Sequence, residues 1–148
     1  MSKDNRIPAQ EKINSLLKKS LADNDYSFEV LADVPLNTVE YVAEHFGIDL
    51  SNFKYVVDSA YIRHTINRHG VGSNDRSPIS LSDFTHIPFI LSNFDSISLG
   101  SVKQNGNKVL VFKKQIGSEY YYVTAQEIRN RRKSVVMNDL YKRKKPQK

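Results

Sequence analysis

One segment, His64-Thr65-Ile66-Asn67-Arg68-His69-Gly70, carries the residue types best suited to chemistry in this chain. Its periodicity predicts a helix on which His64 and Arg68, four positions apart, share a face. An imidazole can transfer a proton near neutral pH and a guanidinium can hold a phosphate, so this pair suits phosphate chemistry. A structural interpretation stays open, in which one histidine packs in the core through a hydrogen bond and Arg68 is solvated. His69 lies five positions from His64, so only unwinding near Gly70 would bring both rings into one site.

The histidines match no common metal-binding pattern. The spacing of His64 and His69 differs from the i,i+4 pair of a helical zinc site, and the chain has no cysteine. His45 and His86 fall in other predicted helices, and we interpret them as surface or packing residues. We therefore expect neither a metal nor a cofactor.

A second candidate feature is the predicted strand 120–127, which is rich in tyrosine. The strand period of two separates its residues into one set of Tyr120, Tyr122, Thr124 and Gln126 and another of Tyr121, Val123 and Ala125. We interpret the second set as the core face and the first as a face that can stack bases and bind phosphates, although tyrosine is also simply a good strand former. Lys113 and Lys114 end the preceding strand and, being adjacent, point to opposite faces, so one of them can reach the same cleft.

Positive charge is concentrated at the C-terminus. The 148 residues carry a net charge of +6, but residues 129–148 hold nine basic side chains and one acidic one. This excess favours a polyanion such as nucleic acid, whereas a solvated turn and tail would be the simpler interpretation. The basic turn contains Arg129, Arg131, Arg132 and Lys133. No apolar run is long enough to span a bilayer, and the first residues lack the apolar core of a signal peptide.

Hydrophobic periodicity indicates helices first and strands afterwards. We expect helices over 9–22, 38–46 and 59–69, and a short one after Ser80 that breaks at Pro88. Strands are predicted over 26–30, 53–57, 97–99, 108–113, 120–127 and 134–141. Gly47 and Gly70 are expected to end helices in the left-handed conformation. This order predicts an α+β fold, with N-terminal helices packed on one face of a roughly four-stranded antiparallel sheet.

The order of the motifs resembles a known nuclease superfamily. HTINRHG is followed by a loop, ISLSDFTHIPFILSNFDSI, a strand ending in FKK, YYYVTAQEI, a basic turn and VVMNDLYKRKK. Over roughly residues 37–145 this layout resembles the phage- and mobile-element-associated nucleases of the barnase–EndoU–colicin–RelE superfamily. The most specific parts are the His-x4-His-Gly ending and the step from Ile87-Pro88-Phe89-Ile90 to Asp95.

The resemblance implies a metal-independent endoribonuclease fold. We divide the chain into a helix and strand extension (1–36), the nuclease domain (37–141) and a basic tail (142–148) whose composition predicts disorder. It implies active-site roles for His64, His69, Lys113 or Lys114, and a hydroxyl residue on the last strand. The chain departs from the pattern there, because Asp139 occupies the hydroxyl position. Thr124 is the candidate to supply the hydroxyl group in place of the residue at position 139.

We therefore expect a toxin that cleaves RNA by attack of the ribose 2′-hydroxyl, leaving a 2′,3′-cyclic phosphate. The candidate catalytic residues are His64 and His69 for proton transfer, Arg68 and Lys113 for phosphate stabilisation, and Tyr122 and Thr124 for orientation. The candidate nucleic-acid-binding residues are Arg129, Arg131, Arg132, Lys133, Lys114 and Tyr120. Two alternatives stay open: a catalytically weak or inactive RNA-binding module, motivated by Asp139, and a protein-interaction component that uses the basic C-terminus.

The expected partners are RNA, with tRNA as one candidate, and a cognate acidic immunity or antitoxin protein. We expect no membrane partner. The expected location is the cytoplasm, either of the producing cell or of a target cell into which the protein is delivered.

Overall fold

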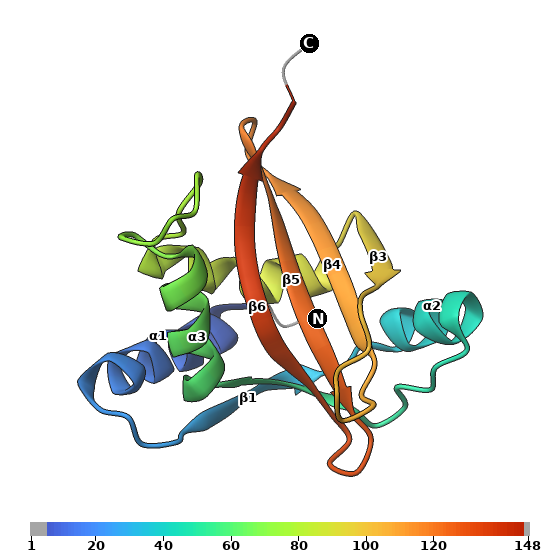
Figure 1. Ribbon diagram of the computed structural model, residues 1–148. Coiled ribbons are helices and arrows are strands. Elements are labelled where there is room, and N and C mark those ends of the chain that lie inside the picture. Colours follow the sequence, from blue (N-terminus) through green and yellow to red (C-terminus); the bar gives the residue numbers. More distant parts are fainter. Residues whose placement is uncertain (1–5, 147–148) are drawn as a thin grey trace.

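The computed structural model describes residues 6–146 and has an α+β architecture (Figure 1). In chain order the elements are α1 (Arg6–Ala22), β1 (Phe28–Asp33), α2 (Leu36–Phe46), β2 (Lys54–Asp58), α3 (Ser59–His69), the 3-10 helix η1 (Leu81–His86), α4 (Ile87–Ser92), β3 (Ser96–Leu99), β4 (Val109–Ile116), β5 (Tyr120–Arg129) and β6 (Ser134–Lys144). All the segments expected to be helical or extended are so, which confirms the class of the fold.

The sheet has six strands in the order β1-β2-β6-β5-β4-β3, so the expectation of about four antiparallel strands is wrong. β3, β4, β5 and β6 form the predicted antiparallel meander, and β1 pairs antiparallel with β2. β2 joins the meander by pairing in parallel with β6. A strand period specifies the faces of a strand but not its partner, so this long-range pairing left no signal in the sequence.

Helices cover one face of the meander. Side chains of η1 and α4, including Phe84, Ile87 and Ile90, pack with Phe112 and Leu140 of the sheet in one core. Figure 1 looks onto the opposite face of β4, β5 and β6, which no helix of the described chain crosses. Instead, α3 flanks this open face beside β6 and also contacts α1.

The prediction of which face of β5 lies against the helices is wrong, although Val123 is buried as expected. Tyr122 is 5% exposed, Thr124 is 0% and Gln126 is 1%, so the polar-aromatic set faces the helices. Tyr121 and Ala125, expected in the core, are partly exposed on the open face. Polar groups can be buried when hydrogen bonds satisfy them. Here the Gln126 amide donates to Thr124 Oγ1 (3.0 Å), and the Tyr122 and Thr124 hydroxyls also have acceptors.

The two ends of the chain are more integrated than expected. Ile13, Leu16 and Leu17 of α1 lie in the same core as the sheet, so residues 6–35 belong to one packed unit with the rest. β6 runs to Lys144, so residues 142–144 are part of the sheet rather than of a disordered tail. The last two residues of that expected tail, 147–148, lie outside the described residues.

The ends of the helices agree with expectation at Gly47 and Pro88 and differ from it at Gly70. Gly47 adopts the predicted left-handed conformation (φ 66°) after α2. Gly70 does not, because its φ is −81°. Its lack of a side chain matters for another reason, since a Cβ there would lie 2.6 Å from the Ile66 carbonyl oxygen. The break expected at Pro88 is confirmed: η1 ends at His86 and Pro88 lies in the first turn of α4.

Candidate active site

A groove of about 440 Å³ lies between α3 and the open face of the sheet. Its lining residues are Tyr61, His64, Arg68, Gly100, Ser101, Lys103, Val109, Val111, Ala125, Asn138 and Asp139. The spacing of its three α3 residues places them on one face of the helix. The start of α3 is fixed by Asp58, whose carboxylate accepts a hydrogen bond from the Tyr61 amide (2.8 Å). We call this space the open-face groove.

His64 and Arg68 both enter the open-face groove, as their spacing predicts, and both are exposed. The ring of Tyr61 lies edge-on to the His64 ring, with 6.1 Å between centroids. An exposed imidazole and guanidinium one turn apart can contact a ligand directly. The alternative of a core histidine therefore does not apply to His64.

His69 does not line the groove, as expected for a regular helix, and its side chain is buried. Its Nδ1 lies 2.7 Å from Asp75 Oδ2, and its Nε2 lies 3.1 Å from Asp139 Oδ2. When protonated, the ring donates to both carboxylates at once. His69 is thus suited to holding Asp139 in place rather than to touching a ligand in the groove.

Asp139 reaches the open-face groove because of a β-bulge. The β5–β6 register pairs Ala125 with Asp139 and Gln126 with Met137, so Asn138 is the extra residue. A bulge re-aims side chains, and here two consecutive residues, Asn138 and Asp139, both line the groove. The Asp139 carboxylate also accepts the Leu140 amide (3.1 Å), and its side chain is 17% exposed. An oriented carboxylate therefore faces the groove from the sheet.

Asp75 anchors His69 from behind. Burial raises the pKa of Asp75, but hydrogen bonds from the Ser77 amide, His69 and Arg143 outweigh it and leave the pKa below its ordinary value. Arg143 Nη1 contacts both carboxylate oxygens, at 3.0 and 3.1 Å. The loop after α3 is thereby tied to β6, and Asp75, His69 and Asp139 form a chain of polar contacts that ends at the groove.

Lys103, from the segment between β3 and β4, supplies a fixed cation. Its ammonium group donates to Tyr61 Oη (2.6 Å) and Asn138 Oδ1 (2.6 Å), and lies 3.3 Å from Glu127 Oε1. Burial lowers the pKa of Lys103, but the contacts with Tyr61 and Glu127 outweigh it and raise the pKa. The groove therefore keeps this positive charge throughout the neutral range.

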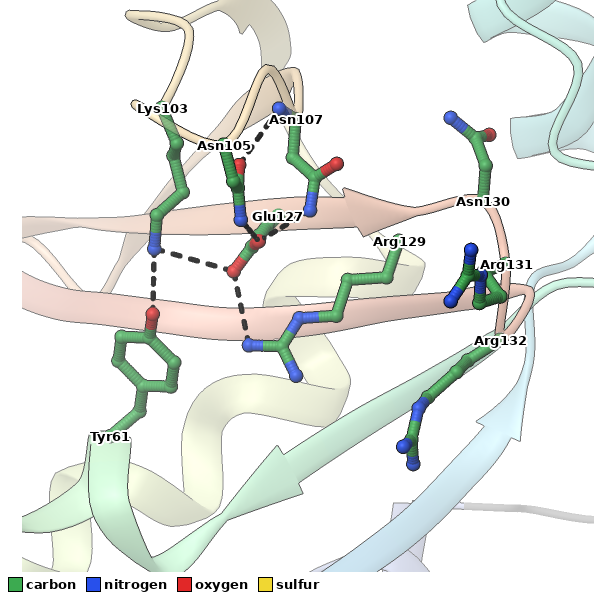
Figure 2. Close-up of a pocket in the computed structure, with 9 residues that line it drawn as sticks. All are labelled: Tyr61, Lys103, Asn105, Asn107, Glu127, Arg129, Asn130, Arg131 and Arg132. Atoms are coloured by element: carbon green, nitrogen blue, oxygen red, sulfur yellow. Dashed lines mark hydrogen bonds and ion pairs between the residues drawn. The ribbon is translucent and has the colours of Figure 1, made fainter.

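A second pocket, of about 280 Å³, adjoins the groove (Figure 2). It is lined by Tyr61, Lys103, Asn105, Asn107, Glu127, Arg129, Asn130, Arg131 and Arg132, and we call it the basic pocket. Tyr61 and Lys103 line both spaces, so the basic pocket lies directly beside the open-face groove. Three arginines at its rim provide the charge that a phosphate backbone requires.

Glu127 organises the basic pocket from its centre. Its Oε2 accepts the amides of Asn105 and Asn107, and its Oε1 accepts Arg129 (3.1 Å) and Asn138 (3.1 Å), as Figure 2 shows in part. Burial raises the pKa of Glu127, but the hydrogen bonds from Asn107, Arg129 and Asn138 outweigh it and lower the pKa to about 2. With its side chain 1% exposed, Glu127 is a structural anion that positions the cations around it.

The remaining predicted residues are dispersed. Lys113 lies on the open face with its ammonium 4.2 Å from the centroid of Tyr121, and Lys114 points away to Asp95 (3.0 Å), which confirms that the two lysines face opposite sides. Neither lines the groove. Tyr120 is half-buried. Lys133 is exposed at the β5–β6 turn.

Tyr122 and Thr124 cannot meet a ligand in the groove. The Tyr122 hydroxyl donates to Asp83 Oδ1 (2.7 Å) under the helices, and the Thr124 hydroxyl donates to the Asp139 carbonyl oxygen (2.7 Å). Their assignment to substrate orientation is wrong, because they lie on the covered face. Thr124 instead supports the backbone of the residue that does reach the groove.

Sequence reasoning missed the contributions of Tyr61, Lys103, Asn138 and Glu127. Tyr61 had a signal, because it lies three positions before His64 on the same predicted helix. Lys103 had none, since its segment meets α3 only in the folded chain. A bulge cannot be located from a period of two, so Asn138 and Asp139 could not be placed together.

Among residues 6–146, no group of three or more histidine and carboxylate side chains is arranged to hold a metal ion. No helix in that range combines the length and the apolar character needed to cross a membrane.

The fold and the groove define the class of protein. It is an α+β protein in which an imidazole, a carboxylate and several cations line a groove beside the open face of a sheet. The chain belongs to the phage-Barnase-EndoU-ColicinE5/D-RelE like nuclease3 family, whose model matches residues 36–148. This confirms the resemblance read from the motifs and makes the protein a member of a nuclease family. No curated protein and no solved structure gave a significant match to the chain.

Proposed function

We propose that this nuclease cleaves RNA by internal transphosphorylation in the open-face groove. One observation carries the proposal: His64 and Arg68 of α3 and Asp139 of β6 line the same groove. Cleavage of this kind needs a proton acceptor, a proton donor and a cation, and requires no further group. The matched family supports nuclease chemistry. The groove residues can supply a base, an acid and a cation but no nucleophile of their own, which favours RNA as the substrate because its ribose 2′-hydroxyl is the nucleophile.

Asp139 is the proposed proton acceptor. The ribose 2′-oxygen forms a bond to the adjacent phosphorus while its proton passes to a free lone pair of the carboxylate. His69 and the Leu140 amide occupy only part of the acceptor capacity of Asp139 and hold its orientation. Arg68 and Lys103, which line the same groove, offset the negative charge that Asp139 brings near the phosphate.

His64 is the proposed proton donor. As the bond between phosphorus and the 5′-oxygen breaks, the leaving oxygen takes a proton from the His64 imidazolium. The products are a 2′,3′-cyclic phosphate and a 5′-hydroxyl, and the net proton balance is zero. A positioned acid or base of this kind contributes typically about 10²–10⁴-fold to the rate.

Arg68 and Lys103 are the proposed phosphate stabilisers. Arg68 is exposed and can donate directly to the phosphate oxygens, on which negative charge grows in the transition state. The ammonium of Lys103 already has its protein partners, so it acts as a fixed charge at short range. A positioned donor of this type is worth about 10²–10³-fold.

The direct test uses a fluorescently labelled single-stranded RNA, incubated with the purified protein in excess chelator. We expect discrete fragments whose new ends are a cyclic phosphate and a 5′-hydroxyl. A matched oligonucleotide with 2′-deoxyribose throughout should stay intact. Cleavage of both oligonucleotides would contradict the 2′-hydroxyl mechanism, and salt-sensitive binding without any cleavage would favour the inactive RNA-binding alternative. The toxin role, the acidic inhibitor and the cellular location stay predictions from the resemblance.

A further inference from the structure

Two neighbouring aromatic side chains lie exposed at the edge of the sheet. Tyr26, just before β1, is 62% exposed and Phe28, the first residue of β1, is 56% exposed, with 6.2 Å between their ring centroids. Both precede residues 36–148, the part of the chain that matches the family model. Large aromatic groups side by side in water are a common mark of a binding surface. Neither ring lines the open-face groove or the basic pocket.

These rings line a third space that adjoins the basic pocket. This edge pocket, of about 240 Å³, is lined by Tyr26, Phe28, Val30, Lys54, Val56, Arg129, Arg132, Ser134 and Val136. Arg129 and Arg132 line the basic pocket as well. Since the basic pocket shares Tyr61 and Lys103 with the open-face groove, the three spaces lie one after another from α3 to β1, and we call this series the path.

The strand register places this path on a single face of the sheet. Val30 pairs with Val56, Val56 with Val136, and Val136 with Glu127. Directly paired residues on neighbouring strands point to the same side of a sheet. The row thus runs from the edge strand to the centre of the basic pocket without changing face.

The charged residues that line the edge pocket are all basic. Among the described residues that line the edge pocket, none is acidic, and Lys54, Arg129 and Arg132 are basic. The Tyr26 hydroxyl is close to the Asp58 carboxylate and, beyond it, to the guanidinium groups of Arg129 and Arg132. A positively charged groove next to exposed aromatic rings is the arrangement with which proteins bind single-stranded nucleic acid: the backbone follows the charges and the bases stack on the rings.

We infer that single-stranded RNA extends from the open-face groove through the basic pocket, and that a base several nucleotides from the cleaved bond stacks on Tyr26 and Phe28. The inference rests on the proposed function, which it extends by assigning a substrate form and a distal binding site. From Ala125 in the groove to Arg129 at the edge pocket, β5 alone covers about 13 Å. A dinucleotide bound in the groove would therefore not reach the two aromatic rings.

The test measures binding of uncleavable 2′-O-methyl oligonucleotides of about three and about ten nucleotides by fluorescence anisotropy. Wild-type protein should bind the long oligonucleotide more tightly than the short one. The double variant Tyr26→Ala/Phe28→Ala should bind the long one about ten-fold more weakly, the size of one lost stacking contact, and the short one unchanged. The swap Tyr26→Phe/Phe28→Tyr keeps both rings and should bind both lengths like the wild type.

Equal affinity of the wild type and the alanine variant for the long oligonucleotide would overturn the inference. So would an equal loss for both lengths, or a change in sedimentation that shows the rings to hold two copies of the chain together while RNA binding is unchanged. The ligand cannot be cleaved, so the result is independent of catalysis. Wild-type protein that binds in this pattern but cleaves no RNA would refute the proposed function and leave the binding path standing.

Discussion

The two faces of the β5–β6 pair carry the same kind of polar cluster in opposite settings. On the covered face, Asp83 accepts hydrogen bonds from Tyr122 (2.7 Å) and Lys142 (3.0 Å). On the open face, Asp139 lies beside His69 and lines a groove. Each cluster joins an aspartate to groups from a different element, but only one of them can be reached by a ligand.

The protonation states of the covered cluster show that it is structural. Burial raises the pKa of Asp83, but hydrogen bonds from Tyr122, the Ser80 amide and Lys142 outweigh it and lower the pKa. Burial, followed by the neighbouring Asp83 carboxylate, raises the pKa of Tyr122. The tyrosine stays a donor and the aspartate an acceptor, so this cluster fastens η1 to the sheet. The comparison teaches that access to solvent, more than residue type, separates the proposed catalytic cluster from the structural one.

Among substitutions that disrupt one of the two clusters, we expect Asp139→Asn on the open face to have the largest effect on RNA cleavage. An amide of the same shape cannot accept the 2′-hydroxyl proton, so single-turnover RNA cleavage should fall by about 10²–10⁴-fold. Binding of an uncleavable RNA should change little. Asp49→Asn, in an exposed turn distant in sequence from the groove residues, serves as the matched control and should cleave like the wild type. Retained cleavage by the Asp139 variant would remove this carboxylate from the mechanism.

The second prediction concerns Glu127, which is on the open face yet buried. Its folded-state pKa of about 2 lies below the ordinary value of 4.5, so the fold favours the charged form. The stabilisation is complete above pH 4.5 and is lost as the pH falls from there towards 2. Its size is about 3 kcal/mol. Denaturant unfolding of the wild type should show this loss between pH 5 and pH 2.

Glu127→Gln isolates that contribution. The variant should be less stable at neutral pH, because Lys103 and Arg129 lose their anion, and its stability should fall less steeply with acid. The exposed Glu119→Gln is the control and should keep the wild-type acid profile. Parallel profiles for wild type and Glu127→Gln would show that Glu127 is not held ionised by the fold.

The smallest effect is expected on the covered face, from Tyr122→Phe. Removing the hydroxyl takes one donor from Asp83 and should lower the free energy of unfolding by about 2 kcal/mol. The cleavage rate at a temperature where the protein is folded should stay unchanged. Thermal melting and single-turnover cleavage on the same preparation give both numbers. A rate loss comparable to that of Asp139→Asn would mean that the covered face takes part in catalysis.

Local patterns in the sequence predicted local features well. The spacing of His64 and Arg68 correctly placed both on one face, and the divergence of His69 followed from the same geometry. The Ser80-x-x-Asp83 pattern is typical of a helix start, and η1 begins there, with the Ser80 amide donating to Asp83 Oδ2 (2.8 Å). These features depend only on residues within a turn or two of one another, which is the range over which periodicity carries information.

Features that depend on distant partners could not be predicted. The parallel pairing of β2 with β6 joins segments eighty positions apart, such as Lys54 and Ser134. The burial of Tyr122 depends on Asp83, a residue of another element, to satisfy its hydroxyl. The bulge at Asn138 shifts the register by one residue, so a strict alternation cannot predict that Asn138 and Asp139 both line the groove.

The most direct test of the account is single-turnover RNA cleavage by His64→Ala, compared with His45→Ala. Both histidines are exposed on helices, but only His64 lines the open-face groove. The account predicts that His64→Ala loses about 10²–10⁴-fold in rate with unchanged thermal stability, while His45→Ala cleaves like the wild type. Full cleavage by a folded His64→Ala protein would contradict the assignment of the catalytic site to this groove.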